Sequence, residues 1–200
     1  MRKLIARIFD YSVDGLIAEE GSEFFKFCRE LPDDPAQVAR TTALYANADL
    51  YIMGRAHYVG MASYFPTAVD HPYADLINAA RKVVFSQTLP AADWANTTIA
   101  RGATAAEIDK LRHGGDGYIM VSGGISFWQS LMRLDLIDEY RVTLLPYLAG
   151  AGQRLFDGLA ESRQLELTSS TPFSNGTVEL EYRHPGREWA APPISLDQKA

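Results

Sequence analysis

The feature that most constrains the fold is a change of pattern near residue 136. Before it, short β-rich runs alternate with helical patterns; after it, three β-like runs follow one another without a helix between them. Such alternation is typical of a mostly parallel sheet, and a closing hairpin adds antiparallel strands. We therefore predict an α/β domain. The β-like runs are 3–9, 50–54, 82–86, 97–100, 117–121, 139–148, 163–173 and 177–184, and the helical patterns are 22–31, 35–48, 72–80, 104–113 and 125–136.

Local signals support several of these boundaries. Ser22 is a candidate N-cap for the helix that follows it. Thr104 with Glu107 has the spacing of a capping box. The sequence Ser-Asn-Gly at 174–176 separates the last two β-like runs and predicts a hairpin turn.

Three of the predicted strands end in residues that suit a phosphate-bearing ligand. If these strands are parallel, their ends share one edge of the sheet, which is where open α/β sheets bind ligands. Arg55 offers a planar cationic fork, and the adjacent Gly123 and Gly124 allow close approach to the backbone. Two of the ends lead into helices, whose free N–H groups favour phosphate. Taken alone, the glycine pair equally predicts a tight turn. The three ends are Gly54-Arg55, Ser86-Gln87 and Ser122-Gly123-Gly124.

Other chemistries lack their signatures. The chain has no G-x-S-x-G, no G-x-x-x-x-G-K-S/T and no G-x-G-x-x-G sequence. Its four histidines show no metal-ligand spacing with one another or with the single cysteine, Cys28, so we predict no metal site.

The composition of the chain further limits the kind of protein that it can be. The net charge of −6 gives no case for a nucleic-acid surface. One cysteine excludes an internal disulfide and favours a reducing compartment. We find neither a signal peptide nor an apolar stretch approaching the roughly 20 residues of a membrane span. We therefore expect a cytoplasmic protein without a membrane partner.

Six motifs that follow one another along the chain indicate a resemblance to a known family. They are SVDGLIA at 12–18, ADLYIMGRAHY at 48–58, KVVFSQTL at 82–89, VSGGISF at 121–127, LIDEYRVTLLPYLAGAGQRLF at 136–156 and FSNGTVELEY at 173–182. With these motifs the chain resembles the dihydrofolate reductase-like superfamily. Within it, the chain is most similar to the C-terminal reductase domain of the bifunctional riboflavin-biosynthesis deaminase/reductase. The resemblance covers roughly residues 2–183.

The resemblance implies a three-layer α/β/α fold, NADPH as hydride donor and a homodimer. It places Gly54 and Arg55 at the cofactor phosphates and Ser86 at the adenosine side. Other motif residues would surround the pyrophosphate and form a loop over the nicotinamide. These are Ser122, Gly123, Gly124 and Ile125 at the pyrophosphate, and Asp14, Gly15, Ile17 and Ala18 in the nicotinamide loop.

Two positions depart from the family pattern. Gln87 replaces the arginine of S-R-T-L, which leaves the choice between NADPH and NADH open. His57 replaces a threonine; it can still donate a hydrogen bond to phosphate, with a charge that depends on pH. The zinc motif of the deaminase half is absent.

Reduction of a C=N bond also needs a proton source. Glu23, near the apolar Phe24 and Phe27, is one candidate if it is partly buried; the alternative is that it only complements the helix dipole. Asp10 is a second candidate, exposed to the cleft if the first strand breaks at Asp10-Tyr11. Water is a third.

We thus expect an NAD(P)H-dependent reductase of a pteridine- or pyrimidine-like heterocycle. The reductase domain would span 1–184, and 185–200 would form an extended or disordered tail in which Trp189 could dock on a surface or partner. The alternative is a non-catalytic homodimer that binds flavin, such as FMN, or another nucleotide.

Overall fold

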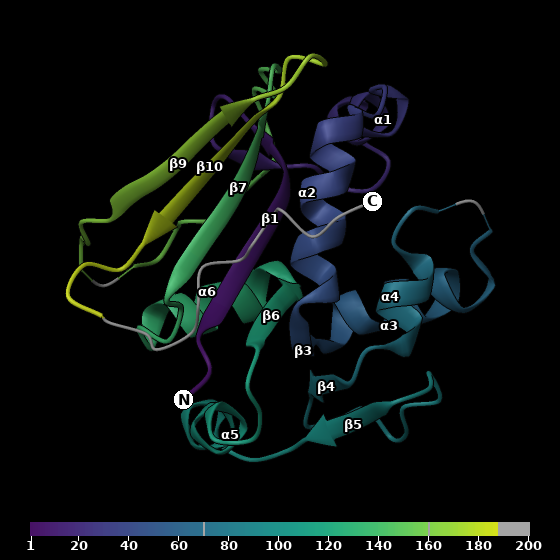
Figure 1. The fold of residues 1–200 in the computed structure, drawn as a ribbon, viewed down its shortest axis with the longest axis vertical. Helices are drawn as coiled ribbons and strands as arrows, with labels where there is room; N and C mark the ends of the chain where they lie inside the picture. The colour runs from purple at the N-terminus through teal and green to yellow at the C-terminus, as the bar shows by residue number, and fades with distance from the viewer. Residues whose placement is uncertain (70, 160, 188–200) are drawn as a thin grey trace.

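A computed structural model describes residues 1–69, 71–159 and 161–187 (Figure 1). Within these residues a ten-stranded sheet has the main order β5-β4-β3-β6-β1-β7-β10-β9, and β2 and β8 extend from β1. The strands are β1 Leu4–Ser12, β2 Leu16–Ile17, β3 Ala48–Gly54, β4 Lys82–Phe85, β5 Thr97–Ala100, β6 Tyr118–Gly123, β7 Glu139–Leu145, β8 Gln153–Arg154, β9 Glu166–Pro172 and β10 Val178–Arg183. The α-helices are α1 Glu23–Glu30, α2 Pro35–Ala46, α3 Arg55–Tyr64, α4 Ala74–Ala79, α5 Thr104–Arg112 and α6 Ile125–Arg133, and a 3₁₀ turn covers Phe65–Thr67.

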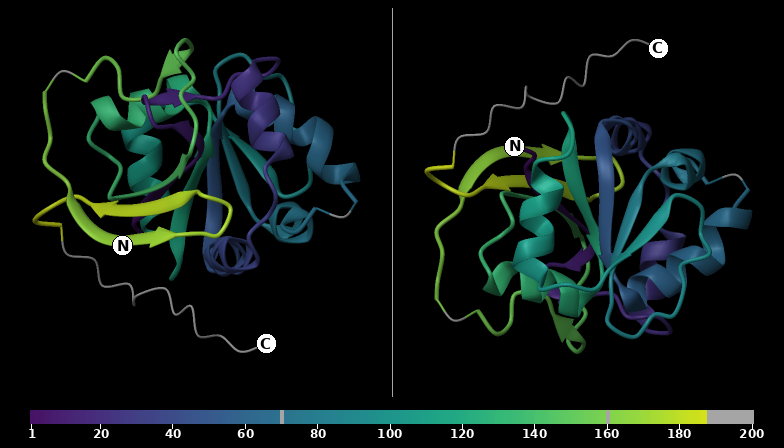
Figure 2. Two further views of the ribbon diagram at one scale, coloured as in Figure 1. Left: turned by 90° about the horizontal axis from the view of Figure 1, so that it is seen from above. Right: turned by 90° about the horizontal axis from the view of Figure 1, so that it is seen from below.

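The helices form two layers, one on each face of the sheet (Figure 2). Alternate residues of β3 point into opposite layers, as the period of a strand requires. Tyr51 packs in a core with Leu44 of α2 and Ile77 of α4. Ile52 packs in the other core with Ile108 of α5 and with α6. The predicted three-layer α/β/α fold is therefore confirmed.

The strand directions also agree with the sequence. The six strands from β5 to β7 pair in parallel, whereas β10 pairs antiparallel with both β7 and β9. The Gly176 N–H donates to the Phe173 carbonyl at 3.0 Å within the predicted hairpin turn. The C-terminal antiparallel hairpin is thus confirmed.

One predicted cap is confirmed and another is wrong. The Ser22 hydroxyl accepts from the Phe25 N–H at 3.0 Å and caps α1. At α5, by contrast, Ala103 occupies the cap position, without a side-chain hydrogen bond. The Glu107 carboxylate instead pairs with Lys110 at 2.9 Å, so Thr104 and Glu107 do not form a capping box.

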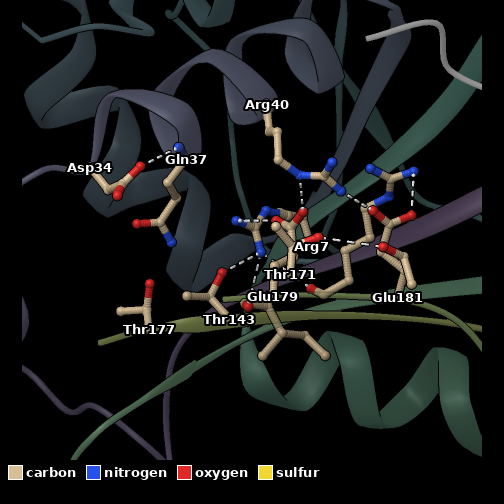
Figure 3. Close-up of polar contacts among 12 residues, drawn as sticks. Arg7, Asp34, Gln37, Arg40, Thr143, Thr171, Thr177, Glu179 and Glu181 are labelled. Carbon is tan, nitrogen blue, oxygen red and sulfur yellow. Dashed lines mark hydrogen bonds and ion pairs between the residues drawn. The ribbon is translucent and has the colours of Figure 1, made fainter. Parts of the chain in front are cut away.

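A layer of charged side chains replaces apolar packing where α2 crosses β1, β7 and β10 (Figure 3). Arg7 is 1% exposed, and its Nη2 lies 3.1 Å from Glu179 Oε2. Arg40 of α2 donates through Nε to the other oxygen of Glu179 at 3.0 Å and also pairs with Glu181. We call these residues, with Lys3, Glu139 and Arg141, the charged layer.

The start of the predicted tail is anchored. Arg187 donates to Asp138 Oδ1 at 2.9 Å and to Asp135 Oδ2 at 2.6 Å. The rest of the tail, including Trp189, lies outside the described residues, so its predicted extended or disordered state is not tested. Among the helices that are described, none is both long and apolar enough to cross a membrane.

Candidate functional site

The three strand ends singled out in the sequence lie side by side. β3 pairs with β4 through Gly54 and Phe85, and with β6 through Met53 and Gly123. All three strands are parallel, so their carboxyl ends share one edge of the sheet, as predicted. Gly54 leads into α3 and Gly124 into α6.

A pocket of about 310 Å³ opens at this edge on the side of α5 and α6, and we call it the α6-side pocket. Arg55 is the only arginine or lysine among its described lining residues, and its Nη1 donates to Thr88 Oγ1 at 2.7 Å. This bond holds the guanidinium beside the loop that follows β4. Four predicted cofactor residues meet here, Gly54, Arg55, Ser86 and Gln87, together with Phe85, Ala100, Gly102, Thr104, Ser126, Phe127 and Ser130.

A second arginine shapes the same loop and was missed in the sequence. Arg101 donates to the carbonyls of Gln87 at 3.1 Å and Leu89 at 2.5 Å. The Gln87 amide donates back to the Arg101 carbonyl at 2.5 Å. Arg101 directly follows β5, the next parallel strand, so the argument from strand ends would have identified it. Its hydrogen bonds fix the shape of the loop that carries Ser86.

Gly123 lies against the ring of His57. A Cβ atom on Gly123 would lie 2.6–2.7 Å from three atoms of the His57 ring, so glycine is needed here to seat the imidazole. The Ser122 hydroxyl lies 3.4 Å from His57 Nε2. Burial lowers the pKa of His57 to about 4, and the ring is therefore neutral near pH 7. A neutral imidazole can donate one hydrogen bond to a phosphate but adds no positive charge.

Gly124 is the residue of the pair that the backbone itself requires. Its φ of 93° lies where side-chain-bearing residues are strained, and it occupies the N-cap of α6. Its carbonyl accepts from the Trp128 N–H at 2.9 Å, and Ile125 begins the helix. This turn directs the first N–H groups of α6 to the carboxyl edge of the sheet, where an anion is favoured.

The burial of His57 predicts acid sensitivity. Between about pH 6.5 and 4 the unfolded chain binds a proton at this residue that the folded chain does not, so stability falls as the pH is lowered through this window. The loss is at most about 3 kcal/mol. We expect His57→Asn to flatten this part of a plot of unfolding free energy against pH, and exposed His113→Asn to leave it unchanged. If the plots of unfolding free energy against pH were parallel for wild type and His57→Asn, they would contradict the lowered pKa of His57.

The predicted nicotinamide loop is tied to a second loop by Asp14. Its carboxylate accepts from the Ser12 hydroxyl at 2.6 Å and from the N–H groups of Ala149 and Gly150 at 3.0 and 2.7 Å. These hydrogen bonds lower the pKa of Asp14 to about 2. Asp14 therefore holds the loop in place, which the sequence did not reveal. Ile17 and Ala18 lie further along, with Ile17 in the short strand β2.

Asp10 lies where this loop meets a second pocket. Its carbonyl accepts from the Ala18 N–H at 3.1 Å, its φ is 55°, and the β1–β7 register shifts between Ile8 and Tyr11. The first strand therefore does not break at Asp10-Tyr11 as expected; it has an irregularity there and continues to Ser12. Burial raises the pKa of the Asp10 carboxyl, against the lowering effects of Arg29, Cys28 and Arg7. A carboxyl group with a raised pKa is suited to donating a proton near neutral pH.

The second pocket measures about 170 Å³ and lies on the opposite face of the sheet, beside α2; we call it the α2-side pocket. The sequence interpretation missed most of it, because it joins α1, α2, β1, β7 and the turn before β10. Its lining residues are Phe9, Asp10, Cys28, Leu31, Pro32, Asp33, Gln37, Val38, Thr41, Tyr73, Thr143, Leu145, Asn175 and Thr177.

Glu23 does not have the environment expected for it. It is exposed at the first turn of α1 and lines neither of these two pockets. Glu23 therefore does not meet the condition of partial burial, because the buried face of α1 presents Phe24, and its place in the first turn fits the alternative of complementing the helix dipole. Among the described residues, no group of three or more His, Cys, Asp or Glu side chains is placed to hold a metal ion.

Similarity to solved structures identifies the class of fold. A putative riboflavin biosynthesis protein from Shewanella sp. PV-4 superposes with a TM-score of 0.72 at 24% identity, covering 90% of this chain and 98% of that one. Dihydrofolate reductase from Enterococcus faecalis, complexed with NADP(H), superposes with a TM-score of 0.62 at 15% identity, covering 92% and 96%. At these identities the likeness shows the fold, which is that of the dihydrofolate reductase-like proteins.

Sequence comparison then identifies the family. The model of the RibD C-terminal domain matches residues 2–179, and the chain belongs to that family. The uncharacterized protein YyaP of Bacillus subtilis is 27% identical in an alignment of 146 positions that covers 69% of this chain and 75% of that protein. The resemblance inferred from the ordered motifs is therefore confirmed.

Proposed function

We propose that this protein is an NAD(P)H-dependent reductase that adds a hydride to a C=N bond of a small pteridine- or pyrimidine-like heterocycle. The observation that carries the proposal is the α6-side pocket, where the ends of β3 and β4 bring Gly54, Arg55 and Ser86 together beside the first turn of α6. The membership of a family of reductase-like folds supports it.

The residues of this edge suit a dinucleotide. Arg55 and the Ser86 hydroxyl would hold the adenosine phosphate, and Gly124 with the N–H groups of α6 would hold the pyrophosphate. The neutral His57 would donate one hydrogen bond there. Ile17 and Ala18 would border the nicotinamide, beside Asp10.

The bound nicotinamide would supply the hydride, and the protein must supply the proton. The reaction delivers two electrons and a proton as hydride to carbon, and a second proton to nitrogen. Asp10 would donate that proton and recover one from water. Its place between the nicotinamide loop and the α2-side pocket favours it over the exposed Glu23.

Titration with NADPH and NADH, followed by calorimetry or fluorescence, tests the proposal. Absence of binding for both at millimolar concentration would refute it. A yellow protein with a flavin spectrum would favour the alternative of an FMN-binding relative. The homodimer and the cytoplasmic location remain predictions, to be checked by light scattering and by cell fractionation.

The Arg55→Ala variant tests the proposed contact with the 2′-phosphate of NADPH. We expect the Kd of NADPH to rise about tenfold, which corresponds to the loss of a charged hydrogen bond, and that of NADH to rise less. Arg81→Ala, at the exposed opposite end of β4, is the matched control and leaves both unchanged. Equal losses of affinity for NADPH and NADH would show that Arg55 does not contact the 2′-phosphate.

A further inference from the structure

The α2-side pocket is small. Its volume is about 170 Å³. Sites for drug-sized ligands typically measure about 300 to 1,000 Å³. A planar ring system fits within this pocket, whereas a ring that also carries a sugar phosphate must extend beyond it.

The charges that line this pocket are negative. Asp10 and Asp33 are the only charged side chains among its described lining residues. Asp33 is exposed at the mouth, whereas Asp10 is half-buried. The Asp33 carboxylate and the Asp10 carboxyl group, with no arginine or lysine among the described lining residues, disfavour a phosphate and favour a neutral or cationic ligand.

The two cations nearby are placed elsewhere. Arg7 lies behind Phe9, with its Cζ 3.8 Å from the ring centroid, and is engaged by Glu179 at 3.1 Å and Thr143 at 2.7 Å. Arg29 is exposed on α1, and its Cζ lies 5.4 Å from the centroid of the Phe25 ring. Arg29 is close enough to oppose the rise in the pKa of Asp10, so it is a cation that a phosphate outside the mouth could reach.

The neutral polar groups of the pocket are held in place. Asp34, 6% exposed, accepts from the Gln37 N–H at 3.0 Å and from the Ser174 N–H at 2.8 Å, which joins α2 to the hairpin turn. Asn175 then donates to Gln37 Oε1 at 3.2 Å. This bond steadies the Gln37 amide, which together with the Phe9 ring can orient a flat ring in the pocket.

We propose that the substrate is a small planar heterocycle without a phosphate group, neutral or cationic, whose N–H edge faces Asp10 and Asp33. This inference rests on the proposed reductase function and names its substrate class. It excludes a substrate that carries a sugar phosphate.

Binding of a free base and its nucleotide tests the inference. We expect cytosine to bind with a Kd at least about tenfold lower than that of cytidine 5′-monophosphate, measured by calorimetry with and without saturating NADPH. Asp10→Asn and Asp33→Asn should each weaken the binding of cytosine by about tenfold, as expected for loss of a hydrogen bond to the N–H edge of the ring. Asp109→Asn, exposed on α5, is the matched control and leaves binding unchanged.

Three results would overturn the inference. These are equal or tighter binding of the nucleotide, nucleotide binding that is lost in Arg29→Ala, and no binding of cytosine at about 10 mM. Failure of NADPH to bind, with cytosine still preferred, would instead refute the reductase function and leave the pocket's selectivity intact.

Discussion

Replacing Glu179 with glutamine is expected to lower the free energy of unfolding by about 3 to 5 kcal/mol, the usual cost of breaking a buried ion pair from one side. Glu179 is 2% exposed and neutralises both Arg7 and Arg40, at 3.1 and 3.0 Å. The variant keeps its volume but leaves Arg7 buried without an opposite charge. Burial already lowers the pKa of Arg7, so its charge is held there at a cost that Glu179 offsets. Urea titration at pH 7 measures the change.

Two further variants make this result specific. Glu166→Gln removes one partner of the exposed pair with Arg183 and should leave the urea midpoint unchanged. Arg7→Met combined with Glu179→Gln removes both buried charges and should recover part of the loss. A Glu179→Gln protein as stable as the wild type would show that the charged layer contributes nothing to folding.

Gly124→Val is expected to raise the Kd of NADPH by about 100-fold, or roughly 3 kcal/mol, and to lower stability by about 1 to 3 kcal/mol. At φ 93° a β-branched residue is strained, so the turn must relax and carry the first N–H groups of α6 away from the pyrophosphate. Cofactor binding is measured by fluorescence, and stability by urea titration.

Gly60→Val is the matched control for this change. Gly60 lies in α3, and a Cβ atom there would have no neighbour within 4 Å, so both binding and stability should stay close to wild type. If Gly124→Val bound NADPH normally, or if no cofactor bound to either protein, the glycine pair would be a tight turn without a binding role.

The strand ends show how far sequence reasoning reached. Glycine and polar residues after buried β runs, with helices between, predicted one shared edge, and the pairing of β3 with β4 and β6 confirmed it. The same argument pointed to Gly54, Arg55, Ser86 and Gln87, which do meet in one pocket. It succeeded because direction and spacing along a strand are local properties of the chain.

The choice between Asp10 and Glu23 shows where such reasoning stopped. Both were plausible acids from their neighbours in the sequence, but exposure of Glu23 and burial of Asp10 depend on how α1 rotates against the sheet and on the shift in β1. Likewise, Gly123 was read as room for a ligand, whereas the His57 ring takes up the space beside it.

The sequence by itself determined the main strands, five of the six described α-helices, the final hairpin and the shared edge of the strand ends, because hydrophobic periodicity and turn residues act over a few positions. Only the tertiary structure decided which acid enters a pocket, which glycine is needed by the backbone and which charges are buried. Those outcomes arise from contacts between residues more than 60 positions apart, such as Ser122 with His57 and Arg7 with Glu179. Such contacts depend on strand register and helix packing.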